Sequence, residues 1–169
     1  FAATGSCELL NSTRAHDFPV KSLCTTTDGQ YVATAASWID NSIKLWKADT
    51  LDFEATLVGH TLGVRCVVAT DSGKDNPMLV SASADETIKI WDLKAYQEIR
   101  TLKGHRNLVS SVAVSGDKKH IISGGFDRIV RLWCFHTGKL ISCFECHTDY
   151  IRCVAILSDG LRAVSASDD

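Results

Sequence analysis

The sequence predicts an all-β chain made of repeated four-stranded units. Two residue types recur at nearly constant steps: the histidines His16, His60, His105 and His147, 44, 45 and 42 residues apart, and the tryptophans Trp46, Trp91 and Trp133. Between them, apolar and polar residues alternate as in half-buried strands, and helical periodicity is absent. A fixed period in the low forties is the sequence signature of a β-propeller array.

Composition limits the classes of partner. The chain has 169 residues, of which 45% are hydrophobic, which is enough to bury a core. A net charge of −2 gives no general attraction to nucleic acid or to an anionic membrane. No apolar run approaches the ~20 residues that a membrane-spanning helix needs. We therefore expect neither nucleic acid nor membrane as a partner.

The cysteines indicate the compartment. Seven is an odd number, and they are scattered through strand-like segments, at Cys7, Cys24, Cys66, Cys134, Cys143, Cys146 and Cys153. This pattern favours buried, reduced thiols over a secreted disulfide framework. The chain also begins at Phe1 without the features of a signal peptide. We expect an intracellular protein, cytoplasmic or nuclear.

The second unit shows its four strands most clearly. Residues 64–69 are rich in β-branched side chains and predict an inner strand, and residues 78–83 predict the next. A tight turn at 84–86 leads into strict alternation over 87–91. Residues 98–102 also alternate and predict an outer, half-exposed strand.

The other units align with the second one. The step from His to the first small hydroxyl residue of the second strand is 18 residues in three units and 21 in the second, where three extra residues fall in the turn 71–77. Two further residues are inserted around 37–39, again at an expected turn. The whole chain, 1–169, therefore predicts one propeller segment with the units 1–15 (the tail of a preceding repeat, with an outer strand near 8–10), 16–59, 60–104, 105–146 and 147–169 (a truncated repeat).

Three complete blades with partial units at both ends do not close a ring, since propellers typically have four to eight blades. An open array would expose strand edges that invite aggregation. Either the chain is part of a longer propeller of seven or eight blades, or copies of it assemble into a homo-oligomer. We favour the longer chain.

One set of residues makes the relationship specific. The patterns Gly59-His60 … Ser81 … Asp85 … Trp91-Asp92 and Gly104-His105 … Ser123 … Asp127 … Trp133 resemble the WD-repeat (WD40) propeller family, over essentially the whole chain. Four positions depart from the family pattern: Lys47 and Cys134 replace the Asp after Trp, and Ala15 and Cys146 replace the Gly before His.

The resemblance implies a structural role for the repeated polar residues. In that family, His, Ser or Thr, Asp and Trp form a hydrogen-bonded tetrad that joins three strands. By position the tetrads are His16-Thr34-Asp40-Trp46, His60-Ser81-Asp85-Trp91 and His105-Ser123-Asp127-Trp133, with His147, Ser165 and Asp169 in the last unit. The indole N–H only donates, so it needs a buried acceptor, and a hydroxyl can accept it while donating onward to imidazole.

Two catalytic or cofactor interpretations compete with this one. His, Ser and Asp could form a hydrolase triad, but a catalytic site is not repeated in every blade, and these residues lie inside apolar strands. Cys143-Phe-Glu-Cys146-His147 matches the C-x-x-C-H haem attachment pattern. His147 already belongs to the repeat, and a structural zinc site would need a fourth ligand. We expect no enzyme activity, cofactor or metal.

The resemblance also implies a binding face. In WD-repeat proteins the third and fifth residues after His, and the residue before the turn Asp, lie at the central mouth of the top face of the propeller. Those positions and the inserted turn supply the partner-binding candidates Lys21, Trp38, Arg65, Leu108, Phe126, Tyr150, Arg152 and Asp168. Aromatic and Arg side chains together are typical of protein-binding hot spots. The alternative is ordinary scatter of such side chains over a surface.

The predicted function is therefore a non-enzymatic scaffold that binds proteins or peptides on its top face. A second hypothesis is a substrate receptor of a cullin-RING ubiquitin ligase. Residues 79–94 are similar to the adaptor-docking box of some WD-repeat proteins, with Lys94 at the basic position. Most of that box is simply a regular repeat.

Overall fold

In the computed structural model, all regular secondary structure of the described residues is β-strand. The structure describes residues 12–37, 39–70, 77–157 and 159–169, and no helix occurs in these ranges. The outer strand expected near 8–10 and most of the turn 71–77 lie outside the described residues. The all-β prediction is confirmed.

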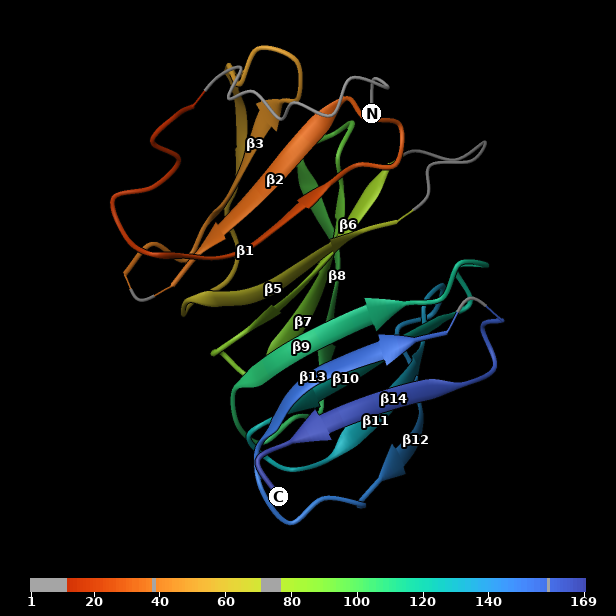
Figure 1. Cartoon of the computed structure of the whole chain (residues 1–169). Coiled ribbons are helices and arrows are strands. Elements are labelled where there is room, and N and C mark those ends of the chain that lie inside the picture. Colours follow the sequence, from red (N-terminus) through yellow and green to blue (C-terminus); the bar gives the residue numbers. More distant parts are fainter. Residues whose placement is uncertain (1–11, 38, 71–76, 158) are drawn as a thin grey trace, which may run out of the picture.

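Twelve of the strands form three antiparallel meanders of four strands each (Figure 1). The first sheet contains β1 (Val20–Thr25), β2 (Tyr31–Ala36), β3 (Ile43–Lys47) and β4 (Phe53–Leu57). The second contains β5 (Val64–Ala69), β6 (Met78–Ser83), β7 (Thr87–Asp92) and β8 (Gln97–Lys103), and the third contains β9 (Val109–Val114), β10 (His120–Gly125), β11 (Val130–Cys134) and β12 (Leu140–Phe144). The last unit pairs β13 (Ile151–Ile156) with β14 (Ala163–Ser167).

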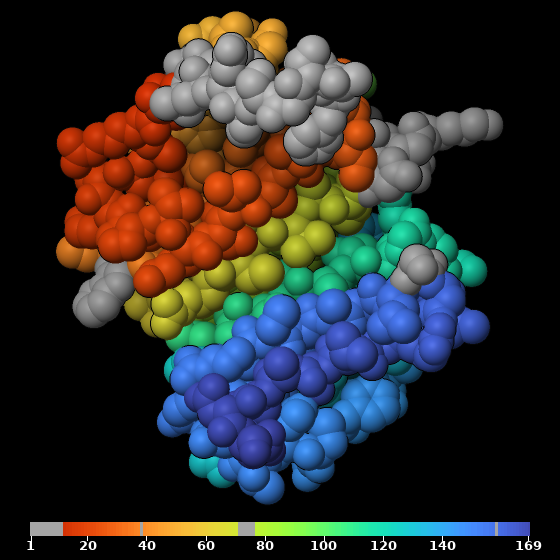
Figure 2. All heavy atoms as spheres, viewed as in Figure 1, coloured from red at the N-terminus to blue at the C-terminus, as the bar shows by residue number. Residues whose placement is uncertain are grey.

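The units follow one another in chain order, as the colour bands of Figure 2 show. Their first strands, β1, β5, β9 and β13, lie side by side and form the inner wall. One small polar residue per inner strand links it to the next. The Val67 N–H donates to Ser22 Oγ over 3.1 Å, and the Val154 N–H donates to Ser111 Oγ over 3.1 Å. The Cys66 thiol contacts the Val112 carbonyl at the equivalent position.

Between neighbouring sheets the core is apolar. Trp91, from the second sheet, packs with Ile43, Leu45 and Leu57 of the first. Trp133 of the third sheet packs in the same way against the second. Both indoles are 1% exposed, so each contributes close to the full burial free energy of a large aromatic side chain. Trp91 and Trp133 therefore each belong to one sheet by sequence and to two sheets by packing.

The cysteines are less buried than the sequence suggested. The described cysteines are free, but Cys143, Cys146 and Cys153 are exposed. Cys143 lies on the outer strand β12, and Cys153 lies on β13, whose sheet has only two strands. Cys24, on the inner strand β1 and packed against the core that includes β5, is different: burial raises the pKa of its thiol to about 12.

Gly125 ends β10 at a bulge in its pairing with β9, so a substitution there tests how closely the two strands approach. A Cβ at Gly125 would lie 2.3 Å from the Leu108 carbonyl oxygen, a backbone atom that cannot move aside easily. We expect Gly125→Ala to destabilise the protein by ~1–3 kcal/mol in urea unfolding. Gly116→Ala is the matched control, because its Cβ would meet open space. Equal stability of the two variants would contradict the close approach.

Candidate functional site

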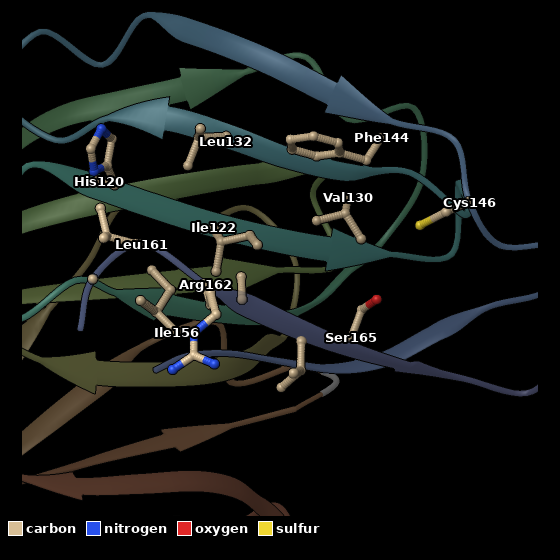
Figure 3. A pocket seen from close by; sticks show the side chains of 13 residues that line it. His120, Ile122, Val130, Leu132, Phe144, Cys146, Ile156, Leu161, Arg162 and Ser165 are labelled. Atoms are coloured by element: carbon tan, nitrogen blue, oxygen red, sulfur yellow. The ribbon is translucent and has the colours of Figure 1, made fainter. Parts of the chain in front are cut away.

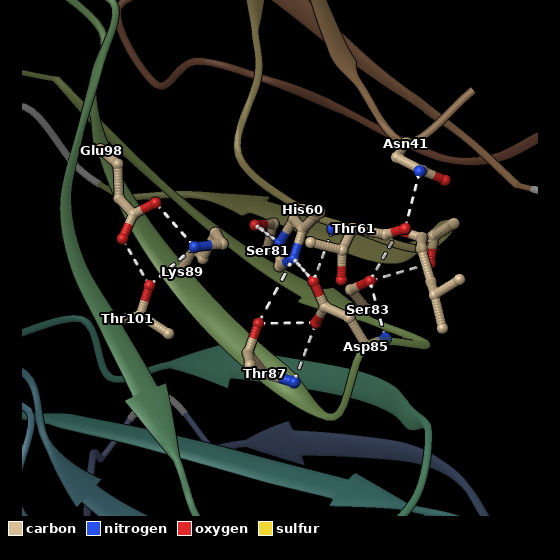
Figure 4. Close-up of polar contacts among 12 residues, drawn as sticks. Asn41, His60, Thr61, Ser81, Ser83, Asp85, Thr87, Lys89, Glu98 and Thr101 are labelled. Atoms are coloured by element: carbon tan, nitrogen blue, oxygen red, sulfur yellow. Dashed lines mark hydrogen bonds and ion pairs between the residues drawn. The ribbon is translucent and has the colours of Figure 1, made fainter. Parts of the chain in front are cut away.

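The second unit shows how the repeated polar residues are connected, and His60, Ser81 and Asp85 of this network are drawn in Figure 4. The Trp91 Nε1–H donates to Ser81 Oγ over 2.8 Å, and Ser81 Oγ lies 2.7 Å from His60 Nε2. Because Ser81 accepts a hydrogen bond from the indole, its own hydroxyl donates to His60 Nε2. The imidazole then carries its proton on Nδ1, which lies 2.8 Å from Asp85 Oδ2.

Asp85 is the anchor at the other end of this chain of hydrogen bonds. Its carboxylate also accepts the Thr61 N–H over 3.0 Å and the Thr87 hydroxyl over 2.6 Å. Burial by itself would raise the pKa of Asp85, but the hydrogen bonds from His60 and Thr87 outweigh it and hold the pKa well below its usual range. The side chain is 6% exposed, and the hydrogen bonds from His60, Thr61 and Thr87 keep it charged.

The other units repeat these contacts. Trp133 Nε1 donates to Ser123 Oγ over 2.9 Å, and His105 joins Ser123 to Asp127. In the first unit His16 joins Thr34 to Asp40, and Trp46 donates to the same Thr34 hydroxyl over 2.9 Å. The two inserted residues before Asp40 therefore leave the contacts intact. In the last unit His147 joins Ser165 to Asp169.

Sequence reasoning missed a set of three cations beside these networks, two of which are buried. Lys44, Lys89 and Arg131 each lie two residues before the unit's Trp, so their spacing from Trp was the signal that could have found them. Arg131 Nη1 lies 2.6 Å from Asp127 Oδ2, and Lys89 Nζ lies 2.6 Å from Glu98 Oε2. Lys89 and Arg131 are 8% and 4% exposed, and such burial requires paired charges.

The same geometry disfavours a catalytic or cofactor role. Ser81 and Ser123 are completely buried, so no substrate can reach their hydroxyls. Both ring nitrogens of His147 have protein partners, Ser165 and Asp169, which leaves neither free to bind haem iron or zinc. No cluster of three metal-ligating His, Cys, Asp or Glu side chains occurs in the part of the chain that the structure describes.

A cavity of about 500 Å³ lies between the third sheet and β14 (Figure 3). Ile122 and Val130 line one side, and Leu161 and Ser165 line the other. Ser165 occupies the repeat position of Ser81 and Ser123, which accept an indole N–H in their own units. In those units the tryptophan of the third strand fills the corresponding space against the preceding sheet. The last unit has two strands, β13 and β14, and so places no tryptophan there. The cavity therefore follows from the repeat pattern and does not indicate a small-molecule site.

A second hollow lies where the inner strands begin. It measures about 200 Å³, and we call it the top-face hollow; its lining residues are Lys21, Arg65, Leu108, Ser110, Phe126 and Arg152. They come from four units: the starts of β1, β5, β9 and β13 and the turn after β10. Five of the sequence-predicted binding residues are therefore brought together here.

Two more candidates, Tyr150 and Asp168, flank the hollow. Together with Phe126 and Arg152 they form what we call the aromatic cluster. The Phe126 and Tyr150 rings stack with centroids 4.3 Å apart, and the Arg152 guanidinium lies 5.0 Å from the centre of the Phe126 ring. Arg152 Nε donates a hydrogen bond to Asp168 Oδ1 over 2.8 Å. The remaining candidate, Trp38, lies outside the described residues.

Comparison with known proteins decides the family. The family model described as WD domain, G-beta repeat, matches residues 7–47, 52–92, 96–134 and 138–169. The chain belongs to the WD40 repeat family. The resemblance stated from the sequence is confirmed, and the three four-stranded sheets are WD40 blades.

Relatives of this WD40 chain include the nuclear distribution protein nudF 1 of Talaromyces marneffei, 34% identical over 81% of this chain and 30% of that protein. The nuclear distribution proteins PAC1 of Arthroderma otae and of Gibberella zeae are each 34% identical, over 77% and 84% of the chain and 30% and 32% of their own lengths. The chain therefore spans about a third of the length of these relatives. In the described residues, no helix is long and apolar enough to cross a membrane.

Removing the indole should cost more than removing the hydroxyl. Trp91→Ala deletes a large buried ring and leaves the Ser81–His60–Asp85 chain without its donor, so we expect a loss of ~3–5 kcal/mol in urea unfolding. Ser81→Ala breaks one link of the network and should cost ~1–2 kcal/mol. An unchanged melting temperature in Trp91→Ala, together with a lost binding activity, would show that the network is a functional site instead.

The buried carboxylates predict acid sensitivity. The pKa values of Asp85 and Asp127 are lowered in the folded protein because hydrogen bonds from their histidines outweigh the opposing effect of burial. Their contribution is therefore present above the unfolded-state pKa of ~3.9 and is lost as the pH falls below it. Urea midpoints measured from neutral pH downward should drop below about pH 4. The drop should be smaller in Asp85→Asn and unchanged in Asp17→Asn, which alters an exposed carboxylate.

Proposed function

We propose that this WD40 chain is a non-enzymatic scaffold that binds a partner protein or peptide segment on its top face. The aromatic cluster beside the top-face hollow carries the proposal. Tyr150 is 36% exposed although it is stacked on Phe126. Aromatic and Arg side chains are the residue types that dominate binding free energy at protein interfaces.

Preorganisation supports the same surface. The Phe126–Tyr150 stack and the Arg152–Asp168 ion pair hold all four side chains before any partner arrives. Ordering a flexible side chain at an interface costs ~0.5–1.5 kcal/mol, and here that cost is already met within the folded chain. The cluster also joins the turn after β10 to both ends of the β13–β14 hairpin, so its shape depends on two neighbouring units.

The relatives support a cellular setting. They are nuclear distribution proteins by name, and we propose that this chain serves a related process in the cytoplasm or nucleus. The free cysteines of the described residues agree with a reducing compartment.

The ubiquitin-ligase hypothesis gains no support. Within residues 79–94, Leu79, Val80, Ile88 and Ile90 are almost completely buried. The Asp92 carboxylate accepts the Lys94 N–H over 2.7 Å and so closes a turn. Most of the stretch is core, which leaves little of it to meet an adaptor.

Partner capture by the full-length protein tests the scaffold proposal. Proteins retained by the wild type should be lost or strongly reduced with Phe126→Ala and Tyr150→Ala, since truncating a hot-spot aromatic commonly costs ~2 kcal/mol or more. Ile99→Ala is the control, because this side chain is similarly exposed but lies on the outer strand β8. Retention of every partner by both aromatic variants would rule out this face.

A further inference from the structure

The charges around the top-face hollow are unevenly neutralised. On the side of the last unit, Arg152 is paired with Asp168, and Asp149 lies near enough to act on its charge. On the side of the first two units, Lys21 and Arg65 line the same hollow and have no ion-pair partner among the described residues. Two cations without an ion-pair partner among the described residues therefore face the hollow, opposite Phe126 and an Arg152 whose charge is balanced by Asp168.

The size of the hollow limits what can enter it. Sites for drug-sized ligands usually measure ~300–1,000 Å³, whereas this one measures about 200 Å³. One side chain of an extended peptide fits such a volume better than a complete small molecule. Leu108 and Phe126 supply an apolar rim against which a neighbouring residue of that peptide can pack.

The unpaired cations determine the chemistry. Arg binds carboxylate and phosphate groups through paired N–H donors, and Lys adds a point charge. A phosphorylated side chain carries ~−1.5 to −2 at neutral pH, which balances both cations, while a carboxylate balances one.

We propose that the top-face hollow is an anion subsite that takes one phosphorylated side chain of a partner's peptide segment, with Lys21 and Arg65 as its ligands. A carboxylate side chain binds there more weakly. The inference rests on the proposed function, because it names the chemistry of the segment that the top face binds. The aromatic cluster then holds the residues next to the anion.

Three fluorescently labelled peptide pools test the subsite. They share degenerate flanking positions and differ only in a central phosphoserine, glutamate or lysine. Fluorescence anisotropy with the full-length protein should rank phosphoserine above glutamate and glutamate above lysine. Binding of the phosphoserine pool should weaken between about 50 and about 200 mM salt, because exposed charges are screened.

Variants assign the effect to residues. Arg65→Gln and Lys21→Gln should each weaken binding of the phosphoserine pool at least tenfold, and Arg65→Lys should lose less because it keeps the charge. Lys94→Gln is the matched control, an exposed cation in the turn between β7 and β8. Equal urea midpoints for all four variants will show that binding, not folding, has changed.

The outcomes separate this inference from the scaffold proposal. Equal binding of the three pools, or unchanged binding by Arg65→Gln, overturns the anion subsite. If partner capture still depends on Phe126 and Tyr150 in that case, the scaffold proposal stands. Partner capture that is indifferent to both aromatic residues overturns the scaffold proposal instead. Tighter binding of anionic vesicles or single-stranded RNA than of any peptide pool, lost in Arg65→Gln, would assign the subsite to a different class of ligand.

Discussion

The indole N–H of the third-strand tryptophan is the constraint on which the rest of the fold depends. It can only donate, and it is buried between two sheets, so an acceptor must be buried with it. The Ser or Thr hydroxyl on the second strand accepts this hydrogen bond and donates one of its own to His, which in turn donates to Asp at the turn. One packing requirement thus places four side chains and orients three strands.

Much of the fold could be predicted from the sequence because the information is local and repeated. The strand β5 (Val64–Ala69) matches the predicted range because β-branched residues end at turn residues on both sides. Each unit also states the same pattern again, so an insertion such as the two residues before Asp40 stands out as a local change. The resemblance nominated the residues that meet at the top-face hollow, because each blade carries the same positions to the same end of the sheet.

What the sequence could not supply depends on neighbours in space. Burial of Lys89 and Arg131 contradicts the usual preference of cations for solvent, and only the nearby Glu98 and Asp127 explain it. The ring stack of Phe126 and Tyr150 likewise needs the relative placement of two units. Exposure of Cys153 reflects a two-stranded sheet, whereas Cys66 at the same repeat position is half-buried between neighbours.

The sharing of Trp91 and of Trp133 between two sheets has a consequence for how such arrays grow. Trp91 packs in the core of the preceding sheet as well as its own. A duplicated unit therefore already contains the side chain that packs against the unit before it. Stability then accumulates as a chain of nearest-neighbour couplings. A gene that gains or loses whole units therefore keeps each sheet together with the tryptophan that packs against it. A gene that is cut within a unit can separate a sheet from that tryptophan.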